Sequence, residues 1–169
     1  ELRAEAPHYA KLIPELPRDV IALVWGYEAD HPFMEQAEKF AATGLPFFVC
    51  PGTSSWNSLV GRTDKGFANL RNAAESGQRH GAVGFLNTDW GDNGHWQYLS
   101  TSDLPFAYGA TVSWNAGSAG DETAFFQAAD LHVFHDESGV ARRIAWELGC
   151  MYQQLKLQNY NSTVLFHLL

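Results

Sequence analysis

The 169-residue sequence contains no run of basic residues, and its acidic side chains outnumber the basic ones. Lysine and arginine total 11, aspartate and glutamate total 19, and the formal net charge is -8 at pH 7. Nucleic acids and anionic membrane surfaces are bound through clustered lysine and arginine side chains. The sequence therefore predicts neither a nucleic-acid partner nor a membrane partner.

Long hydrophobic stretches are also missing. The longest apolar stretches, Val20 to Trp25 and Leu45 to Cys50, are much shorter than the roughly 20 residues that a membrane-spanning helix requires. The residues that follow Glu1 do not have the pattern of a secretory signal. We expect no membrane anchor.

Cysteine is scarce, and the motifs of several enzyme classes are absent. Cys50 and Cys150 lie far apart without metal-ligand spacing, which favours reduced thiols over a disulfide and predicts a cytoplasmic or otherwise reducing location. His95 has no partner at the spacing of zinc ligands. The sequence carries no dinucleotide fingerprint, phosphate loop or nucleophile elbow. We therefore expect no cofactor and no metal.

What the sequence does contain is three strand-like segments, each followed by a helical one. The strands are predicted at residues 19–25, 45–50 and 82–86, and the helices at residues 32–44, 63–80 and from 102 onward. The first strand is apolar and rich in β-branched residues, which is typical of a strand buried on both faces of a parallel sheet. The alternation predicts an α/β fold in which all strands end on one side.

The sequence becomes helical after residue 118, and we predict two parts, residues 1–118 and residues 119–169. Helices are expected from Asp121 or Glu122 to Ala129 and from Gly139 to Leu157. The second of these has an apolar stripe made of Val140, Ile144, Leu148 and Met151. Four aromatic residues at helical spacing are expected to pack in the core: Trp114, Phe125, Phe126 and Trp146.

Polar and aromatic residues follow each predicted strand. These candidate site residues are Trp25 and Glu28 after the first strand, Trp56 after the second, and Asp89, Trp90, Asp92 and His95 after the third. An indole packs on the apolar face of a pyranose, and a carboxylate accepts hydrogen bonds from sugar hydroxyls. The strand ends therefore predict a carbohydrate-binding site.

Several of these residues also have a structural interpretation. Trp25 also fits the core, and Glu28 fits the start of the next helix, where the macrodipole favours an acidic side chain. Trp56 fits an anchor of its loop, and His95 fits a surface turn. Trp90 is the residue for which ligand contact is favoured over packing, because an indole and two acids share one strand end.

The three strand ends together resemble a known enzyme family. Val24 to Glu28, Cys50 to Trp56, and Leu86 to Asp92 are similar to the last three strand ends of glycoside hydrolase family 20, the β-N-acetylhexosaminidases. The resemblance implies a partial (β/α)8 TIM barrel, made of the last three β/α units and followed by C-terminal helices. It also implies that Trp25 is the aromatic residue of strand six.

For the last strand, the resemblance implies that Trp90 stacks on the sugar in the terminal subsite and that Asp92 holds the hydroxyls of the sugar. The family usually has Glu at the position of Asp92. It usually has an Asp and a Tyr where the preceding loop of this chain has Ser54, Ser55 and Trp56.

The family hydrolyses its substrate with the help of the substrate's own acetamido group, and an Asp-Glu pair after strand four orients that group and protonates the leaving oxygen. Asp121-Glu122 and Asp136-Glu137 are the only such pairs here, and both lie in the helical C-terminal part. The resemblance thus implies one part of a glycoside hydrolase that removes terminal N-acetylhexosamine, with the catalytic pair upstream.

Two expectations follow for the chain on its own. It is expected to lack hydrolase activity, and it is expected to self-associate or to pair with the missing half of the barrel, because an open set of three strands leaves uncovered edges. The alternative is a non-catalytic carbohydrate-binding or structural α/β module.

Overall fold

The computed structural model describes residues 12–157 and 159–168. At its centre lies a three-stranded sheet made of β1 (Ala22–Trp25), β2 (Phe47–Cys50) and β3 (Gly84–Phe85), in that order. Neighbouring strands are parallel, with Ala22 opposite Phe47 and Phe48 opposite Gly84. The predicted α/β class is confirmed, and so is the parallel sheet.

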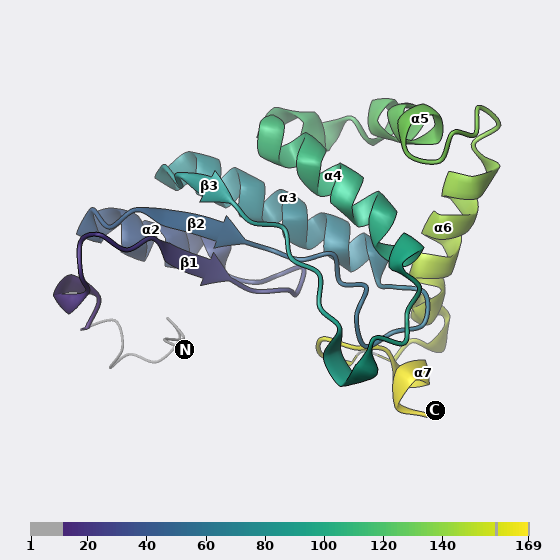
Figure 1. The fold of residues 1–169 in the computed structure, drawn as a ribbon, viewed down its shortest axis with the longest axis horizontal. Helices are drawn as coiled ribbons and strands as arrows, with labels where there is room; N and C mark the ends of the chain where they lie inside the picture. Colours follow the sequence, from purple (N-terminus) through teal and green to yellow (C-terminus); the bar gives the residue numbers. More distant parts are fainter. Residues whose placement is uncertain (1–11, 158, 169) are drawn as a thin grey trace.

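Three helices follow the three strands along the chain (Figure 1). α2 (Phe33–Thr43) packs on β1 and β2, and α3 (Thr63–His80) packs on β2 and β3. α4 (Asp103–Trp114) packs alongside α3. The order is the alternation of strand and helix that the sequence predicts.

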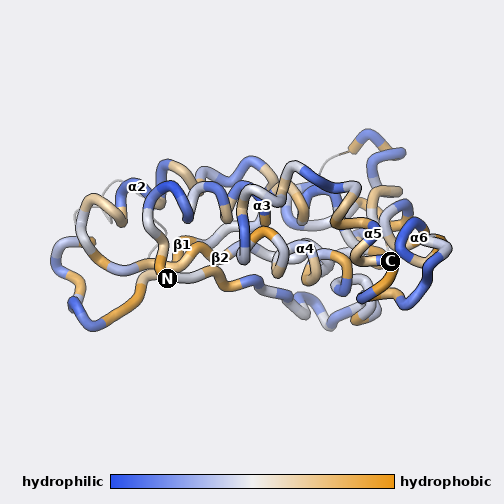
Figure 2. The backbone as a smooth tube through the Cα atoms, turned by 90° about the horizontal axis from the view of Figure 1, so that it is seen from above, coloured by the Kyte–Doolittle hydropathy of each residue, from blue (hydrophilic) through white to orange (hydrophobic). Residues whose placement is uncertain are grey.

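The ends and faces of the first two helices follow from the sequence. α2 buries the four residues that the sequence places on one helical face, Phe33, Gln36, Ala37 and Phe40. Both helices end at a glycine in the left-handed region, Gly44 with φ 68° and Gly81 with φ 73°, where a residue with a Cβ is strained. Figure 2 shows the apolar strands β1 and β2 beside helices whose residues alternate between hydrophilic and hydrophobic.

One face of the sheet carries no helix among the described residues. Leu23, Phe48 and Gly84 are aligned across the three strands. Leu23 is 47% exposed, whereas its neighbour Val24 is buried against the helices. The prediction that the first strand is buried on both faces is therefore wrong for this chain, because the helices that cover the sheet lie on one side.

The C-terminal helices share a core with α3 and α4. α5 (Glu122–His132) and α6 (Val140–Cys150) contribute to a cluster in which the rings of Phe67 and Tyr108 stack at 3.9 Å. This core crosses residue 118, and the predicted division into two parts stays a prediction. The remaining elements are short: η1 (Ile13–Glu15), η2 (Asp92–Gly94), η3 (Leu99–Ser102), η4 (Ala116–Gly120), η5 (Met151–Leu155) and α7 (Val164–His167).

Two packing predictions for the helices are wrong. Trp114 is 92% exposed, because the buried face of α4 is formed by other residues, among them Leu104, Tyr108 and Val112. The predicted apolar stripe of α6, Val140, Ile144, Leu148 and Met151, is exposed, because the helix approaches α3 through the buried Gly149. Phe125 and Trp146 pack in the core as predicted.

Candidate functional site

The loops that follow the three strands meet at one end of the sheet, and we call residues 26–32, 51–62 and 86–98 the carboxyl-end rim (Figure 1). The second and third loops continue the parallel pairing of the sheet. The Thr53 N–H donates to the Thr88 carbonyl, and the Thr88 N–H donates to the Pro51 carbonyl, each at 3.0 Å. The rim is therefore held by backbone hydrogen bonds beyond the last residue of each strand.

A buried side chain from α3 joins the first two loops of the rim. The Asn69 amide donates to the Gly26 carbonyl at 3.0 Å and to the Glu28 carbonyl at 2.8 Å. Its oxygen accepts the Gly52 N–H at 3.1 Å. Asn69 is fully buried with three partners, so it fixes the spacing of the two loops.

Four aromatic side chains gather on the rim. Tyr27 lies at the centre, with its ring centroid 5.6 Å from Trp25, 4.9 Å from Trp56 and 6.3 Å from Trp90. Trp56 meets the edge of Tyr27 at 81°, a favourable arrangement for two aromatic rings. The end of β1 and the second and third loops thus bring three of the predicted site residues around Tyr27: Trp25, Trp56 and Trp90.

Trp90 is the half-exposed member of this group, with 47% of its surface accessible. Its indole N–H points inward and donates to the Tyr27 hydroxyl at 2.9 Å and to the Thr88 hydroxyl at 3.2 Å. Burial raises the pKa of Tyr27, so its hydroxyl stays protonated at neutral pH. The orientation of the indole is therefore fixed while much of its surface faces solvent.

Asp92 lies two residues beyond Trp90 and is half-buried. Its carboxylate accepts one long hydrogen bond, from the Asn57 amide at 3.4 Å. The oxygen of Asn57 in turn accepts from the Asn93 amide at 2.9 Å. A carboxylate has about four acceptor positions, so Asp92 retains acceptor capacity for further donors.

Asp89 has a different environment from Asp92. It accepts hydrogen bonds from the hydroxyls of Thr53 at 2.7 Å, Ser55 at 2.5 Å and Ser102 at 2.7 Å. Ser102 lies at the start of α4, so the carboxylate joins the second loop, the third loop and this helix. The structure gives Asp89 the task of holding the rim together, and its predicted contact with a ligand stays a prediction.

Glu28 is also engaged inside the protein. Its carboxylate pairs with Arg62 at 2.9 Å and with Lys65 at 3.4 Å, and it accepts the Asn161 N–H at 2.6 Å. Glu28 and Arg62 are both buried. This ion pair occupies the carboxylate of Glu28. Its predicted contact with a ligand stays a prediction.

The charge of Glu28 is stabilised by these partners. Burial on its own raises the pKa of a carboxyl group, but here the Arg62 guanidinium, the Asn161 N–H and the Lys65 ammonium outweigh that effect. The pKa of Glu28 consequently lies below its ordinary value. The carboxylate is ionised at neutral pH and holds the first loop against α3.

Trp56 is buried, with 1% of its surface accessible. Its indole N–H donates to the Asn161 side chain at 2.9 Å, and the Thr163 N–H donates to the Asn57 carbonyl at 3.0 Å. The C-terminal segment therefore closes over the second loop. This arrangement matches the loop-anchor interpretation of Trp56, and its role as a wall for substrate stays a prediction.

His95 lies at the outer part of the third loop. It is half-buried with φ 57°, and its ring packs near Gly91. Beyond it, Trp96 is exposed, with its indole N–H bound to the Asn93 carbonyl at 3.0 Å. Asn93, Trp96, Phe166 and His167 line an open hollow of about 370 Å³. The predicted ligand contact of His95 stays a prediction.

The two thiols and the histidines form no reactive or metal-binding cluster in the described part of the chain. Cys50 and Cys150 are free, and burial raises the pKa of each thiol to about 11. Both are therefore protonated at neutral pH. Among residues 12–157 and 159–168, no three His, Cys, Asp or Glu side chains are placed to hold a metal ion.

Sequence reasoning missed several residues that build the rim. Tyr27 stood between two predicted site residues, so its position was a usable signal. Asn57 and Asn93 lie in polar loops whose fold is not evident from the sequence. Asn161 reaches Trp56 across 105 positions, and no local pattern could have identified that contact.

Comparison with known proteins gave no match. No protein family, curated protein or solved structure is similar to this chain at a significant level. None of the helices in the described ranges combines the length and apolar character that crossing a bilayer requires.

Proposed function

We propose that this chain forms the sugar-binding part of a β-N-acetylhexosaminidase-like glycoside hydrolase, as the last three β/α units of a (β/α)8 barrel. The parent enzyme removes terminal N-acetylhexosamine by substrate-assisted, retaining hydrolysis, and another part of the barrel supplies the Asp-Glu pair. The observation that carries the proposal is the half-exposed indole of Trp90, whose orientation is fixed by its hydrogen bond to Tyr27. The carboxylate of Asp92, two residues further along, retains acceptor capacity.

The geometry of Trp90 suits a pyranose ring. Stacking on an indole requires an exposed aromatic face, and a fixed ring loses less conformational entropy on binding than a mobile one. The indole N–H of Trp90 is already satisfied by Tyr27 and Thr88, so binding leaves no polar atom of that ring unpaired. A sugar that stacks on Trp90 would place its hydroxyl groups beside the loop that carries Asp92.

The strand topology also favours this site. In barrels of parallel strands and helices, active sites lie at the carboxyl ends of the strands. Trp25, Trp90 and Asp92 all lie at that end of this sheet. α2 covers β1 and β2, and α3 covers β2 and β3, which supports the proposal of a barrel wall.

Three residues of the two Asp-Glu pairs, Asp121, Glu122 and Asp136, make structural contacts. Asp121 caps α5 by accepting the Ala124 N–H at 2.9 Å, and Glu122 pairs with Arg71. Asp136 accepts the N–H groups of Ser138 and Ala141. These contacts favour an upstream origin for the catalytic pair, so we expect the isolated chain to bind sugar without hydrolysing it.

The alternative is a non-catalytic carbohydrate-binding or structural module. The structural contacts of the Asp-Glu pairs also favour this alternative, because a non-catalytic module needs no catalytic acid. The enzyme part and the carbohydrate-binding module both predict sugar binding at Trp90, whereas a structural module does not. The first two differ in whether hydrolysis appears when further barrel units with an Asp-Glu pair are joined to the chain.

The proposal is tested by isothermal titration of the chain with N-acetylglucosamine and with its thiazoline derivative, a mimic of the cyclised intermediate. We expect binding of both compounds, and about tenfold weaker binding or none after Trp90→Ala or Asp92→Ala, a change of about 1.4 kcal/mol or more. Trp114→Ala is the matched control, because it removes an exposed indole away from the rim.

Equal loss of affinity in Trp114→Ala and Trp90→Ala would contradict the assignment of the site. Absence of binding in the wild-type chain would contradict the proposed function itself. Circular dichroism on each variant separates loss of binding from loss of fold.

A further inference from the structure

A hollow lies between the third loop of the carboxyl-end rim and α7 near the C-terminus. Asn93 and Trp96 line it from the loop, and Phe166 and His167 line it from α7. Its volume is about 370 Å³, which is within the range of about 300–1,000 Å³ that is typical of small-molecule pockets. The sugar site proposed at Trp90 leaves this hollow without a role.

Trp96 presents its indole to the hollow in the same way that Trp90 presents one to the proposed sugar site. Its side chain is 59% exposed, and its indole N–H donates to the Asn93 carbonyl at 3.0 Å. The ring of Phe166 stands almost perpendicular to it, at 88° and with 6.5 Å between the centroids. Trp96 is therefore an accessible aromatic face of fixed orientation, which is the feature that stacks on the apolar face of a pyranose.

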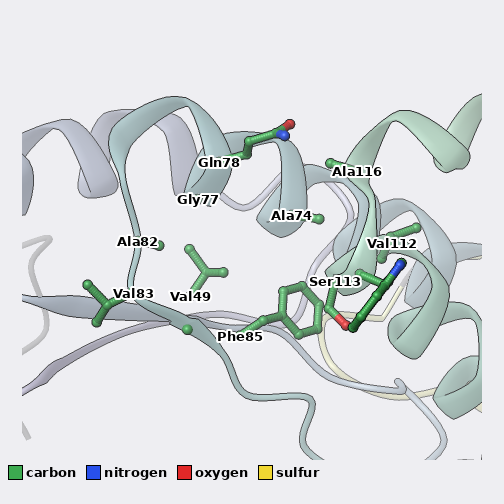
Figure 3. Close-up of a pocket in the computed structure, with 12 residues that line it drawn as sticks. Val49, Ala74, Gly77, Gln78, Ala82, Val83, Phe85, Val112, Ser113 and Ala116 are labelled. Atoms are coloured by element: carbon green, nitrogen blue, oxygen red, sulfur yellow. The ribbon is translucent and has the colours of Figure 1, made fainter.

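The pocket beside β3, between α3 and α4, is built differently (Figure 3). Its volume is about 290 Å³, but its lining consists mostly of aliphatic residues and glycine, with Val49, Val83 and Val112 among them. Trp114 borders it, and no hydrogen bond to a described residue fixes the Trp114 indole N–H. A ring that has to be ordered costs conformational entropy on binding. The hollow at Trp96 is therefore the better match for a sugar.

The hollow adjoins the carboxylate of Asp92. The Asn57 amide nitrogen donates to Asp92 at 3.4 Å, and the Asn57 oxygen accepts from the Asn93 amide at 2.9 Å, so one side chain contacts both residues. The loop also closes on itself, because the buried Gln97 side chain donates to the Trp90 carbonyl at 3.2 Å. The proposed sugar site and the hollow are therefore parts of one joined loop.

The polar side chains of the hollow are an amide and an imidazole. The Asn93 amide oxygen has no partner among the described residues, and the His167 Nε2 lies 2.8 Å from the Ser162 hydroxyl, which leaves Nδ1. Such groups pair with sugar hydroxyls and acetamido groups. The four lining residues include no Lys or Arg, the side chains that bind carboxylate and sulfate groups. The hollow is therefore suited to a neutral sugar.

The C-terminal segment that carries α7 is fixed on the rim. The Asn161 N–H donates to Glu28 at 2.6 Å, and the Asn161 side chain accepts from the Trp56 indole at 2.9 Å. The Thr163 N–H donates to the Asn57 carbonyl at 3.0 Å, and the Thr163 hydroxyl caps α7. This wall of the hollow is thus in place before a ligand binds, and it comes from outside the three β/α units.

We infer that this hollow binds the second sugar unit of a neutral oligosaccharide whose terminal unit stacks on Trp90. Trp96 stacks on the second unit, and Asn93 and His167 hydrogen-bond to its hydroxyl or acetamido groups. The inference rests on the proposed function, because the terminal unit is held at Trp90. It gives the C-terminal segment a direct part in recognising the substrate.

The inference is tested by isothermal titration of the chain with N-acetylglucosamine and with diacetylchitobiose, a neutral disaccharide of the same sugar. We expect the disaccharide to bind about tenfold more tightly, and we expect Trp96→Ala to remove this gain without changing the affinity for the monosaccharide. Trp96→Phe keeps an aromatic face and is expected to retain most of the gain. Trp114→Ala is the control that leaves both affinities unchanged.

Nitrogen-edited NMR spectra of the indole N–H groups separate this inference from the proposed function. We predict that the monosaccharide shifts the Trp90 signal alone and that the disaccharide shifts the signals of Trp90 and Trp96. A Trp96 signal that stays unchanged while Trp90 shifts with both sugars would overturn the inference and leave the proposed function intact. Unchanged signals of both indoles would contradict both. Equal or tighter binding of a hyaluronan disaccharide, which carries a carboxylate, would contradict the restriction to neutral sugars.

Discussion

Two sets of buried polar groups, those of Asn69 and Asp89 and those of Asn87, differ in how completely this chain satisfies them. On the rim, Asn69 has three hydrogen-bond partners and Asp89 accepts from three hydroxyls. By contrast, both polar atoms of the Asn87 amide, which faces α4, are buried without a partner, as are polar atoms of Arg62 and Gln97. Buried polar groups in native proteins are nearly always paired. The comparison shows that asparagine amides at two buried positions of this chain are in opposite states, one fully engaged and the other unpaired.

The largest effect on the free energy of unfolding is predicted for the buried ion pair of Glu28 and Arg62. Glu28→Ala leaves Arg62, which has no accessible surface, without its carboxylate partner. We expect a loss of about 3–5 kcal/mol in the free energy of unfolding, because an uncompensated charge then stays buried. Urea denaturation followed by circular dichroism measures it.

The matched control is the exposed pair of Glu35 and Lys39 on α2. Glu35→Ala is expected to change the free energy of unfolding by about 1 kcal/mol or less. Equal effects of Glu28→Ala and Glu35→Ala would mean that the rim is not held by its buried ion pair.

The same substitution at two asparagines sharpens the comparison. Asn69→Leu removes three hydrogen bonds and leaves backbone groups unpaired, so we expect the chain to lose about 1–3 kcal/mol or more of stability. Asn87→Leu removes a side chain whose buried polar atoms have no partner, and we expect a gain of about 1–3 kcal/mol in the isolated chain.

Thermal unfolding of the two variants beside the wild-type chain measures both signs. Destabilisation of similar size by both substitutions would show that Asn87 already has a partner in the isolated chain. That result would remove the contrast between Asn69 and Asn87.

A smaller effect is predicted for the dependence of stability on pH. The pKa of Glu28 is lowered in the folded state, so its contribution is complete above the ordinary glutamate pKa of about 4.3 and is lost as the pH falls through the folded-state value. The difference in unfolding free energy between wild type and Glu28→Gln should therefore be constant near neutral pH and narrow below about pH 4. A difference that widens with acid would contradict the role of this charge.

The sequence predicted the parts of the fold that depend on local pattern. The bounds of α3 and the glycine stops after α2 and α3 follow from helical spacing and from the left-handed conformation that glycine accepts. The parallel sheet follows from alternating strands and helices. These features are encoded within segments of 5 to 18 residues and need no knowledge of distant partners.

The errors arose where distant segments decide which side is buried. Trp114 has the spacing of a core residue, but α4 turns Leu104 and Tyr108 to α3 and leaves the indole in solvent. The first strand has the composition of a fully buried strand, but this chain covers one of its faces. In both cases the apolar pattern is present, and no element among the described residues covers it.

The gathering of the candidate residues could be predicted in part, whereas their contact with a ligand stays a prediction. Residue types at the strand ends pointed to the carboxyl end of the sheet, where Trp25, Trp56 and Trp90 lie around Tyr27. The distinction between Asp89 and Asp92 could not be predicted, because it depends on Ser102 and Asn57, which reach these carboxylates from other segments. Only the folded arrangement separates the engaged carboxylate from the one with acceptor capacity.

The most direct measurement for the proposed function is the NMR signal of the Trp90 indole N–H during titration with N-acetylglucosamine. This N–H donates to the Tyr27 hydroxyl, while the indole ring of Trp90 is half-exposed. Stacking of a sugar on that ring should therefore shift the Trp90 N–H signal and leave the Trp114 indole signal unchanged. A saturable shift of Trp90 alone is the result that we predict. A Trp90 signal that does not move, or moves together with that of Trp114, would contradict the assignment of the carboxyl-end rim as a sugar-binding site.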